Sequence, residues 1–457
     1  MTIFLMSVSL VVATLLGVWG TSRFPRFFPM YFFVLVPLDM LWLNEYYILT
    51  YRPESLLDVP IILKVIKDIV WLIVLLCFAL WRFSGRRSAS FPRDLALPIL
   101  LFVGYQILQA IRGYFSIGLV GELLAVYKNL LYIPAAYLAI YLIRAPSDLR
   151  LLARRFAYLM LAASAYGFVQ MTLQLGNDWP VKGSGALRPG AYSSFFLSYD
   201  QLGWFACTVF ALILLQKEAF KEVRWLYWLT LGTSLFWAVA SQSRTAIVAL
   251  CAVVGVLVLR RRVRGAAAFG LAGVLGFLGA EATQLIAPVG WLQGIRIFTP
   301  SDNVLLNSRF TIAWPYLWHF FAERPLVGSG LGLFGFETYQ SLYPGVSESF
   351  AGADNTYLLV ALTGGLIGLG LFLFMLFRLL RVSVRTSRAP GNPDVTQAAA
   401  GLLLALVVSL VYFFPTDFLD GFPMSLYIWF LIGAIGGVAN LAREMRLGRV
   451  HPVPNLP

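Results

Sequence analysis

Long runs of apolar residues are the feature that most restricts how this chain can fold. Four of these runs are Trp225 to Ala240, Ala246 to Leu259, Ala266 to Ile286 and Ala398 to Phe414. With their flanks they approach the ~20 residues that cross a bilayer as a helix. Because hydrocarbon offers no water to backbone amides, such segments must be helical, and a barrel would instead alternate apolar and polar residues. We therefore expect an all-α polytopic membrane protein.

The composition excludes a water-soluble protein. Of the 457 residues, 59% are hydrophobic and 12% are charged, whereas soluble domains carry about 25% charged residues. The net charge of +13 could indicate a nucleic-acid partner. The basic residues, however, lie in short clusters between the apolar runs, so we interpret them as determinants of membrane topology and expect no nucleic-acid partner.

The apolar runs predict about a dozen transmembrane helices, within a single integral-membrane domain that covers residues 1–457. The first run is interpreted as a helix and not as a signal peptide, because it has neither a basic start nor a clear small-residue cleavage site. The thirteen expected helices cover residues 2–20, 28–49, 61–81, 94–111, 123–143, 156–175, 200–216, 225–240, 246–259, 266–286, 356–377, 396–414 and 424–442.

The distribution of Lys and Arg predicts which helix ends face the cytoplasm. If the loop that carries Arg82, Arg86, Arg87 and Arg93 is cytoplasmic, alternation along the chain places the other basic clusters on the same side. The segments on this side then hold 24 of the 35 basic residues and 5 of the 22 acidic ones. This asymmetry agrees with the positive-inside rule and sets the expected orientation.

Two segments on the outer side are long enough to hold a functional site: residues 176–199 and residues 287–355. Short loops leave little room for one. The longer segment contains the aromatic-rich pieces IAWPYLWHFF and LGLFGFETYQ. We expect these pieces to form helices in the membrane interface, with Trp314 and Trp318 at the depth of the lipid headgroups.

Cysteine and histidine do not indicate a metal site. Cys77, Cys207 and Cys251 lie scattered in apolar segments, where we expect packing roles. His319 and His451 are too far apart in the sequence to predict a metal cluster. No metal and no cofactor are therefore expected.

Three arginines on the expected outer face need an explanation, because they run against the positive-inside trend. Arg188 lies in GSGALRPGAYSS, Arg244 in the turn SQSRTA, and Arg309 in NSRFTIAW. A guanidinium group can bind a phosphate or diphosphate through two hydrogen bonds, and several such groups together could neutralise a diphosphate leaving group. Alternatively, each one reaches lipid phosphates or pairs with a nearby carboxylate.

An ordered set of motifs resembles the superfamily of O-antigen ligases, O-antigen polymerases and exopolysaccharide polymerases. In this chain the set is SQSRTA, then NSRF, then ERPLVGSGLGLF, then ADNTYLLVALTGGLIGLGLF. ALRPGAYSS followed by YDQLG is a looser fifth match. No single motif is specific, but their order and expected topology agree with the superfamily, and residues 241–377 form the core region of the resemblance.

The resemblance implies a GT-C-like helical bundle in the bacterial inner membrane, with its active site facing the periplasm. The donor would be an undecaprenyl-diphosphate-linked glycan, held by Arg188, Arg244 and Arg309 together with Ser243 and Asn355. The acceptor would be another glycan or lipid A core. Membrane lipid is a further partner, and contacts with other polysaccharide assembly proteins are compatible with this interpretation.

Asp354 stands where ligases of the superfamily carry a histidine before the asparagine. That histidine is the proposed activating group for the acceptor hydroxyl, so the resemblance assigns this role to Asp354. The carboxylate is ionised near neutral pH and can accept a proton, though more weakly than imidazole. The alternative role for Asp354 is a helix N-cap, and the two roles are compatible.

The expected activity is a metal-independent glycosyl transfer that polymerises O-antigen or exopolysaccharide repeat units. A ligase that transfers the glycan to lipid A core is the alternative, and the missing histidine favours the polymerase. A lipid-linked glycan flippase is an alternative of another class, although transporters usually place charged sites at the membrane midplane. A third possibility is a metal-dependent transferase that uses Glu54 and Asp58.

Two further patterns are given no catalytic role. The run GSGLG at residues 328–332 follows no strand, so we expect it to allow a sharp turn or a close backbone approach and not to bind a nucleotide. Gly364 with Gly368, and Gly433 with Gly437, have the spacing of helix packing contacts.

Overall fold

The computed structural model describes residues 31–38, 40, 69, 71–79, 91–117, 130–173, 179–180, 187–188, 193–194, 196, 198–241, 243–260, 314–331, 355–419 and 423–448. The longer elements in these ranges are helices: α4 (Arg93–Ile117), α6 (Pro134–Leu142), α7 (Pro146–Leu173), α8 (Tyr199–Leu214), α9 (Arg224–Ala240), α10 (Arg244–Leu259), α13 (Trp314–Glu323), α15 (Thr356–Arg388), α16 (Pro393–Tyr412) and α17 (Met424–Arg446). Short elements are η1 (Tyr31–Leu35), η2 (Lys217–Val223) and the antiparallel pair β1 (Trp179–Pro180) and β2 (Leu187–Arg188).

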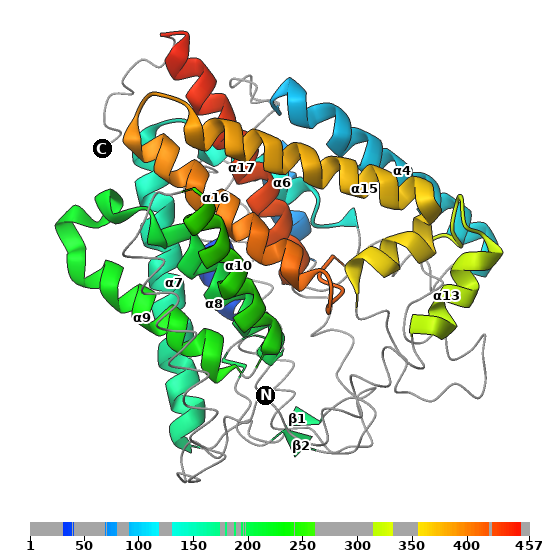
Figure 1. Cartoon of the computed structure of the whole chain (residues 1–457), viewed down its shortest axis with the longest axis horizontal. Coiled ribbons are helices and arrows are strands. Elements are labelled where there is room, and N and C mark those ends of the chain that lie inside the picture. Colours follow the sequence, from blue (N-terminus) through cyan, green and yellow to red (C-terminus); the bar gives the residue numbers. More distant parts are fainter. Residues whose placement is uncertain are drawn as a thin grey trace.

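The helices form a bundle around α16. This helix packs against α8, α10, α15 and α17, while α6 lies on α17 and α4 lies along α15 (Figure 1). Its start is fixed by Pro393 in the first turn and by Asn392, whose Oδ1 accepts the N–H of Asp394. The helix is apolar almost throughout, which explains why most of its side chains are buried within the bundle.

The fold is that of an all-α polytopic membrane protein, as predicted. Within the described residues, five helices are long and apolar enough to span a membrane: α4, α7, α15, α16 and α17. The pair formed by α8 and η2–α9 meets the same criterion only together, with a bend of 88° between its halves. The expected helices at 2–20 and 266–286 lie outside the described residues, as do parts of those at 28–49, 61–81 and 123–143.

Two predicted helix boundaries were wrong by about ten residues. The helix expected at 156 begins at Pro146, because the Asp148 carboxylate accepts the N–H groups of Arg144 and Ala145 and so fixes an earlier first turn. The helix expected to end at 377 continues to Arg388. In both cases the extra turns carry arginines that the sequence analysis had assigned to loops.

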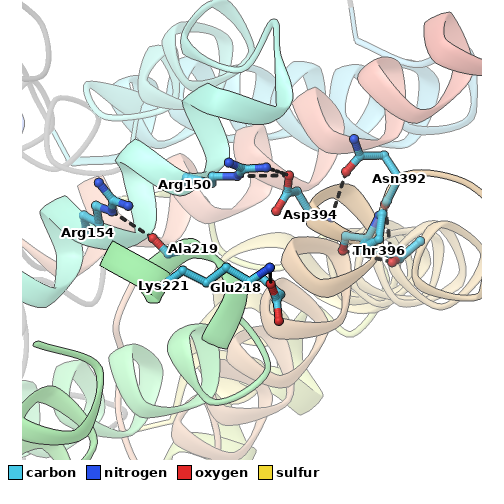
Figure 2. A network of polar contacts seen from close by, with 9 residues as sticks. Arg150, Arg154, Glu218, Ala219, Lys221, Asn392, Asp394 and Thr396 are labelled. Atoms are coloured by element: carbon cyan, nitrogen blue, oxygen red, sulfur yellow. Dashed lines mark hydrogen bonds and ion pairs between the residues drawn. The ribbon is translucent and has the colours of Figure 1, made fainter. Parts of the chain in front are cut away.

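Most basic residues of the described helices gather at one end of the bundle, which we call the basic end; Arg112 of α4 and Arg244 of α10 are exceptions. Arg150 of α7 binds Asp394 of α16 with nitrogen–oxygen distances of 2.6 and 3.0 Å, and Arg154 donates to the carbonyl oxygen of Ala219 in η2 (Figure 2). Arg260 at the end of α10 donates to Ser387 near the end of α15. These contacts join the same ends of α7, α10, α15 and α16.

Glycines allow two of the helix pairs to touch backbone to backbone. A Cβ at Gly401 of α16 would lie 2.5 Å from the carbonyl oxygen of Leu212 in α8. A Cβ at Gly433 of α17 would overlap the backbone of Ala136 in α6. The expected packing role of Gly433 is therefore confirmed.

Helix α15 is broken at Gly365, and the break is filled by the loop that follows α13. The φ and ψ angles of Gly365 are 64° and −165°. The N–H groups of Ser329 and Gly330 donate to the carbonyls of Leu362 and Thr363 at 2.8 and 3.0 Å. The loop therefore replaces helical hydrogen bonds that the break removes.

The same loop satisfies the other side of the break. The N–H groups of Leu366 and Ile367 donate to the carbonyls of Pro325 and Leu326, at 2.8 and 3.2 Å. Gly328 and Gly330 have φ angles of 67° and 100°, which confirms the sharp turn expected of the GSGLG run. That run joins two pieces of backbone, and α13 packs beside it on the first half of α15 (Figure 1).

Candidate functional site

The SQSR turn connects α9 to α10 at the end of the bundle opposite the basic end, and we call this end the SQSR end. The Ser241 hydroxyl donates to the carbonyl oxygen of Ala238 and accepts the N–H of Ser243 at 3.4 Å. Both serines are almost completely buried. The turn is therefore held by its own side chains inside the protein.

Two neighbouring helices reach the turn through Ser243. The Ser243 Oγ donates to Oδ1 of Asp200, in the first turn of α8, at 2.7 Å. The hydroxyl of Tyr412, the last residue of α16, donates to the same Oγ at 3.3 Å. These bonds bring together residues that are 43 and 169 positions apart in the sequence.

A glycine on α8 allows this close contact. A Cβ at Gly203 would lie 2.7 Å from the Tyr412 hydroxyl and 2.8 Å from Ser241 Oγ. Both atoms are buried, so the surrounding packing leaves no space for either one to move away from an added Cβ. Any larger residue at position 203 would separate α8 from the turn.

We expect Gly203→Ala to lower the melting temperature of the detergent-solubilised protein, because overpacking a dense contact costs about 1–3 kcal/mol. Gly255→Ala on α10 is the matched control, since a Cβ there would meet nothing within 4 Å. The control should be neutral or slightly stabilising, as alanine favours helix more than glycine does. Equal melting temperatures for the two variants would contradict the tight contact at Gly203.

The start of α15 joins the same end of the bundle. The Thr356 N–H donates to the carbonyl oxygens of Phe413 and Thr416 at 2.8 and 3.0 Å, directly after the end of α16. Asn355 precedes it and caps the helix, with its Oδ1 accepting the N–H of Leu358 at 2.9 Å. The N-cap of α15 is thus Asn355. The alternative role that we considered for Asp354 was this cap, which the structure places one residue later.

Arg244 is the first residue of α10 and is partly exposed at the SQSR end. The structure therefore places three of the predicted site residues, Ser243, Arg244 and Asn355, at one end of the bundle. For Arg188 the structure describes the backbone, which pairs with that of Trp179 between the strands β1 and β2. Arg309 and Asp354 lie outside the described residues.

The segment before α8 is anchored in the bundle beside this site. Ser194 has a φ angle of 55°, uncommon for a residue other than glycine. Its hydroxyl donates to the carbonyl oxygen of Ala163 at 2.6 Å, and its own carbonyl accepts from Gln170 at 3.1 Å, so both bonds tie it to α7. This anchor fixes the end of the 176–199 segment that carries Arg188.

Asp200 and Tyr412 were missed by the sequence analysis. Asp200 had a signal, because it is the one charged residue in the sequence between positions 189 and 216, and an ionisable residue in such an apolar stretch is a candidate for a functional role. Tyr412 had none, since a tyrosine near the end of an apolar helix also fits a position in the membrane interface. Only the fold shows that it contacts the turn.

The electrostatics of the SQSR end suit an anionic ligand. Helices α8, α10 and α15 all begin here, so the positive ends of three helix dipoles point toward this side. Arg244 adds a full positive charge at the start of α10, whereas the Asp200 carboxylate in the first turn of α8 offsets part of it and accepts the Ser243 hydroxyl. Among the described residues, no group of three His, Cys, Asp or Glu side chains is arranged to hold a metal ion.

Comparison with known families identifies one segment of the chain. Residues 229–373 match a family model described as O-antigen ligase. The match begins inside α9, includes the SQSR turn, α10, α13 and the break in α15, and ends within α15 before α16. No curated protein matches the chain.

Proposed function

We propose that the chain, whose residues 229–373 match the O-antigen ligase family model, transfers an undecaprenyl-diphosphate-linked glycan at the SQSR end. The match supports a membrane glycosyltransferase of the ligase and polymerase type, which acts on lipid-linked glycans. The finer proposal adds the donor, the site and the direction of transfer. The single observation that carries it is the position of Arg244 at the start of α10, beside two other helix starts.

The proposed orientation places the SQSR end on the periplasmic side of the bacterial inner membrane. The support is the gathering of Arg150, Arg154 and Arg260 with other basic residues at the opposite end, which the positive-inside rule assigns to the cytoplasm. A lipid-linked glycan reaches such a site from the outer leaflet. No sugar nucleotide is then needed as donor.

In the proposed reaction an acceptor hydroxyl attacks the anomeric carbon of the donor glycan. The bond between that carbon and the diphosphate oxygen breaks, and the diphosphate leaves with the electron pair. The guanidinium groups of Arg188, Arg244 and Arg309 stabilise the negative charge that develops on the leaving diphosphate, without a metal ion. Asp354 accepts the proton of the attacking hydroxyl, and Ser243 and Asn355 support substrate binding.

The acceptor distinguishes the two versions of this activity. A polymerase transfers the growing glycan to another lipid-linked repeat unit, whereas a ligase transfers it to lipid A core. Asp354 in place of the ligase histidine favours the polymerase. The description of the matching family favours the ligase, which we keep as the second candidate.

We expect deletion of the gene to remove long glycan chains and leave single repeat units on their normal acceptor. The physical reason is that chain growth, and not attachment, depends on a polymerase. Separating surface and lipid-linked glycans by size on a gel tests this, with re-expression of the wild-type protein as control. Long chains that accumulate on the lipid carrier would instead establish the ligase, and an unchanged glycan pattern would contradict both.

The same gels separate transfer from transport. Loss of a flippase would leave repeat units on the cytoplasmic side, with no glycan on the surface. We expect the deletion strain to keep single units on the surface, because the proposed protein acts after the donor has crossed the membrane.

A further inference from the structure

The Asp200 carboxylate is joined to the start of α10, although it belongs to a different helix. It accepts the Ser243 hydroxyl proton at 2.7 Å, and Ser243 also accepts from Tyr412. Ser243 is thus held between a carboxylate of α8 and a phenol of α16. The next residue in the chain is Arg244.

The hydroxyl of Ser243 has an unusual hydrogen-bond partner for a serine at the start of a helix. Ser243 occupies the N-cap position of α10, where a serine usually accepts a backbone N–H two or three residues further on. Ser198 and Asn355 make that bond at the starts of α8 and α15. Ser243 makes no such cap bond and donates to Asp200 instead. Its hydroxyl therefore connects helices and does not cap its own.

A helix dipole alone does not account for this arrangement. Acidic residues are favoured in the first turn of any helix, and Asp148 occupies that position in α7. Asp148, however, accepts the N–H groups of Arg144 and Ala145, which lie only four and three positions before it. Asp200 instead binds a residue 43 positions away, in a buried turn between two other helices. The bond to Ser243 therefore ties the SQSR turn to α8, in addition to placing a carboxylate at the start of α8.

We propose that Asp200 is a positioning residue for Arg244. Its carboxylate fixes Ser243, and thereby the direction in which α10 leaves the turn, so that the Arg244 guanidinium faces the lipid diphosphate. This inference rests on the proposed function. It adds a residue outside the segment that matches the O-antigen ligase family, since Asp200 precedes residue 229.

The test measures the dissociation constant for undecaprenyl diphosphate with the purified full-length protein in detergent. We expect Asp200→Leu and Ser243→Ala each to weaken binding about ten-fold, the effect of losing one hydrogen bond to a charged group. Because both variants interrupt one chain of contacts, the double variant should bind no more weakly than either single one. Ser243→Thr keeps the hydroxyl and should restore most of the affinity.

Two further variants separate positioning from a general effect on the fold. Asp148→Leu removes a first-turn carboxylate at the basic end and should leave the affinity unchanged. Arg244→Ala should weaken binding on its own, and adding Asp200→Leu to it should cause no additional loss, because the group being positioned is already absent. If Asp200 had a merely structural role, adding Asp200→Leu to Ser243→Ala or to Arg244→Ala would weaken binding further in each case.

Distinct outcomes overturn this inference and the proposed function. If Arg244→Ala loses affinity while Asp200→Leu and Ser243→Ala bind like the wild type, Asp200 does not position Arg244 and Ser243 does not support binding, but the proposed diphosphate site at Arg244 stands. Equal losses for Asp200→Leu and Asp148→Leu would also overturn the positioning role. If Arg244→Ala itself binds like the wild type, the proposed diphosphate site is wrong.

Discussion

Gly365→Ala is expected to prevent most of the protein from accumulating in the membrane in folded form. The backbone of Gly365, with φ 64° and ψ −165°, lies in a region that is almost restricted to glycine, and another residue there costs about 1–3 kcal/mol. An added Cβ would also overlap the backbone of Leu326 in the docked loop. Relieving that overlap means giving up the hydrogen bonds across the break, so we expect a total cost above about 3 kcal/mol.

The measurement is the amount of monodisperse protein extracted from membranes, together with its melting temperature. Gly370→Ala is the matched control, because it lies in the same helix and an added Cβ there would meet nothing within 4 Å. We expect the control to behave like the wild type. If Gly365→Ala were as abundant and as stable as Gly370→Ala, the break in α15 and the docking of the loop would be incorrect.

The break also explains a sequence motif in physical terms. The PLVGSG residues supply two N–H donors and two carbonyl acceptors to the interrupted helix. The Tyr105 hydroxyl of α4 donates to the Gly364 carbonyl at 2.7 Å, and its ring lies against Gly364 and Gly368. Those two glycines are packing contacts, as predicted. The motif thus has a structural role in fixing the half of α15 that begins at the SQSR end.

Helix positions followed from the sequence wherever apolar runs had clear ends. The expected helices at 225–240, 246–259 and 424–442 agree with α9, α10 and α17 to within about four residues. Prediction failed where a helix carries arginines on one side, as in α7 and in the last turns of α15. Hydropathy alone treats such turns as loops, although their other residues still pack against the bundle.

The candidate site was only partly predictable for a different reason. Arg244 and Ser243 could be selected because they lie in a polar turn between two apolar helices. Asp200 is marked in the sequence only as an isolated charge, and Tyr412 is not marked at all; their contacts with the turn cross the bundle, and local sequence patterns hold no information about such contacts. The break at Gly365 was missed because glycines in membrane helices usually indicate close packing.

Arg244→Ala is expected to reduce glycan transfer by about a hundred-fold or more. Removing one donor that stabilises a developing negative charge typically costs that much in rate, because the low-dielectric site strengthens the interaction. Arg244→Lys keeps the charge but loses the bidentate hydrogen bonding of the guanidinium group, so its transfer rate should lie between those of the wild type and Arg244→Ala. Arg224→Ala is the matched control, since Arg224 is the first residue of α9 at the basic end.

The most direct test of the proposed function is therefore glycan transfer by the purified protein in lipid vesicles, with an undecaprenyl-diphosphate-linked repeat unit as both donor and acceptor. The wild type and Arg224→Ala should extend the glycan without added divalent metal, and Arg244→Ala should extend it at no more than about one hundredth of the wild-type rate. Similar transfer by Arg244→Ala and the wild type would contradict the proposed site at the SQSR end.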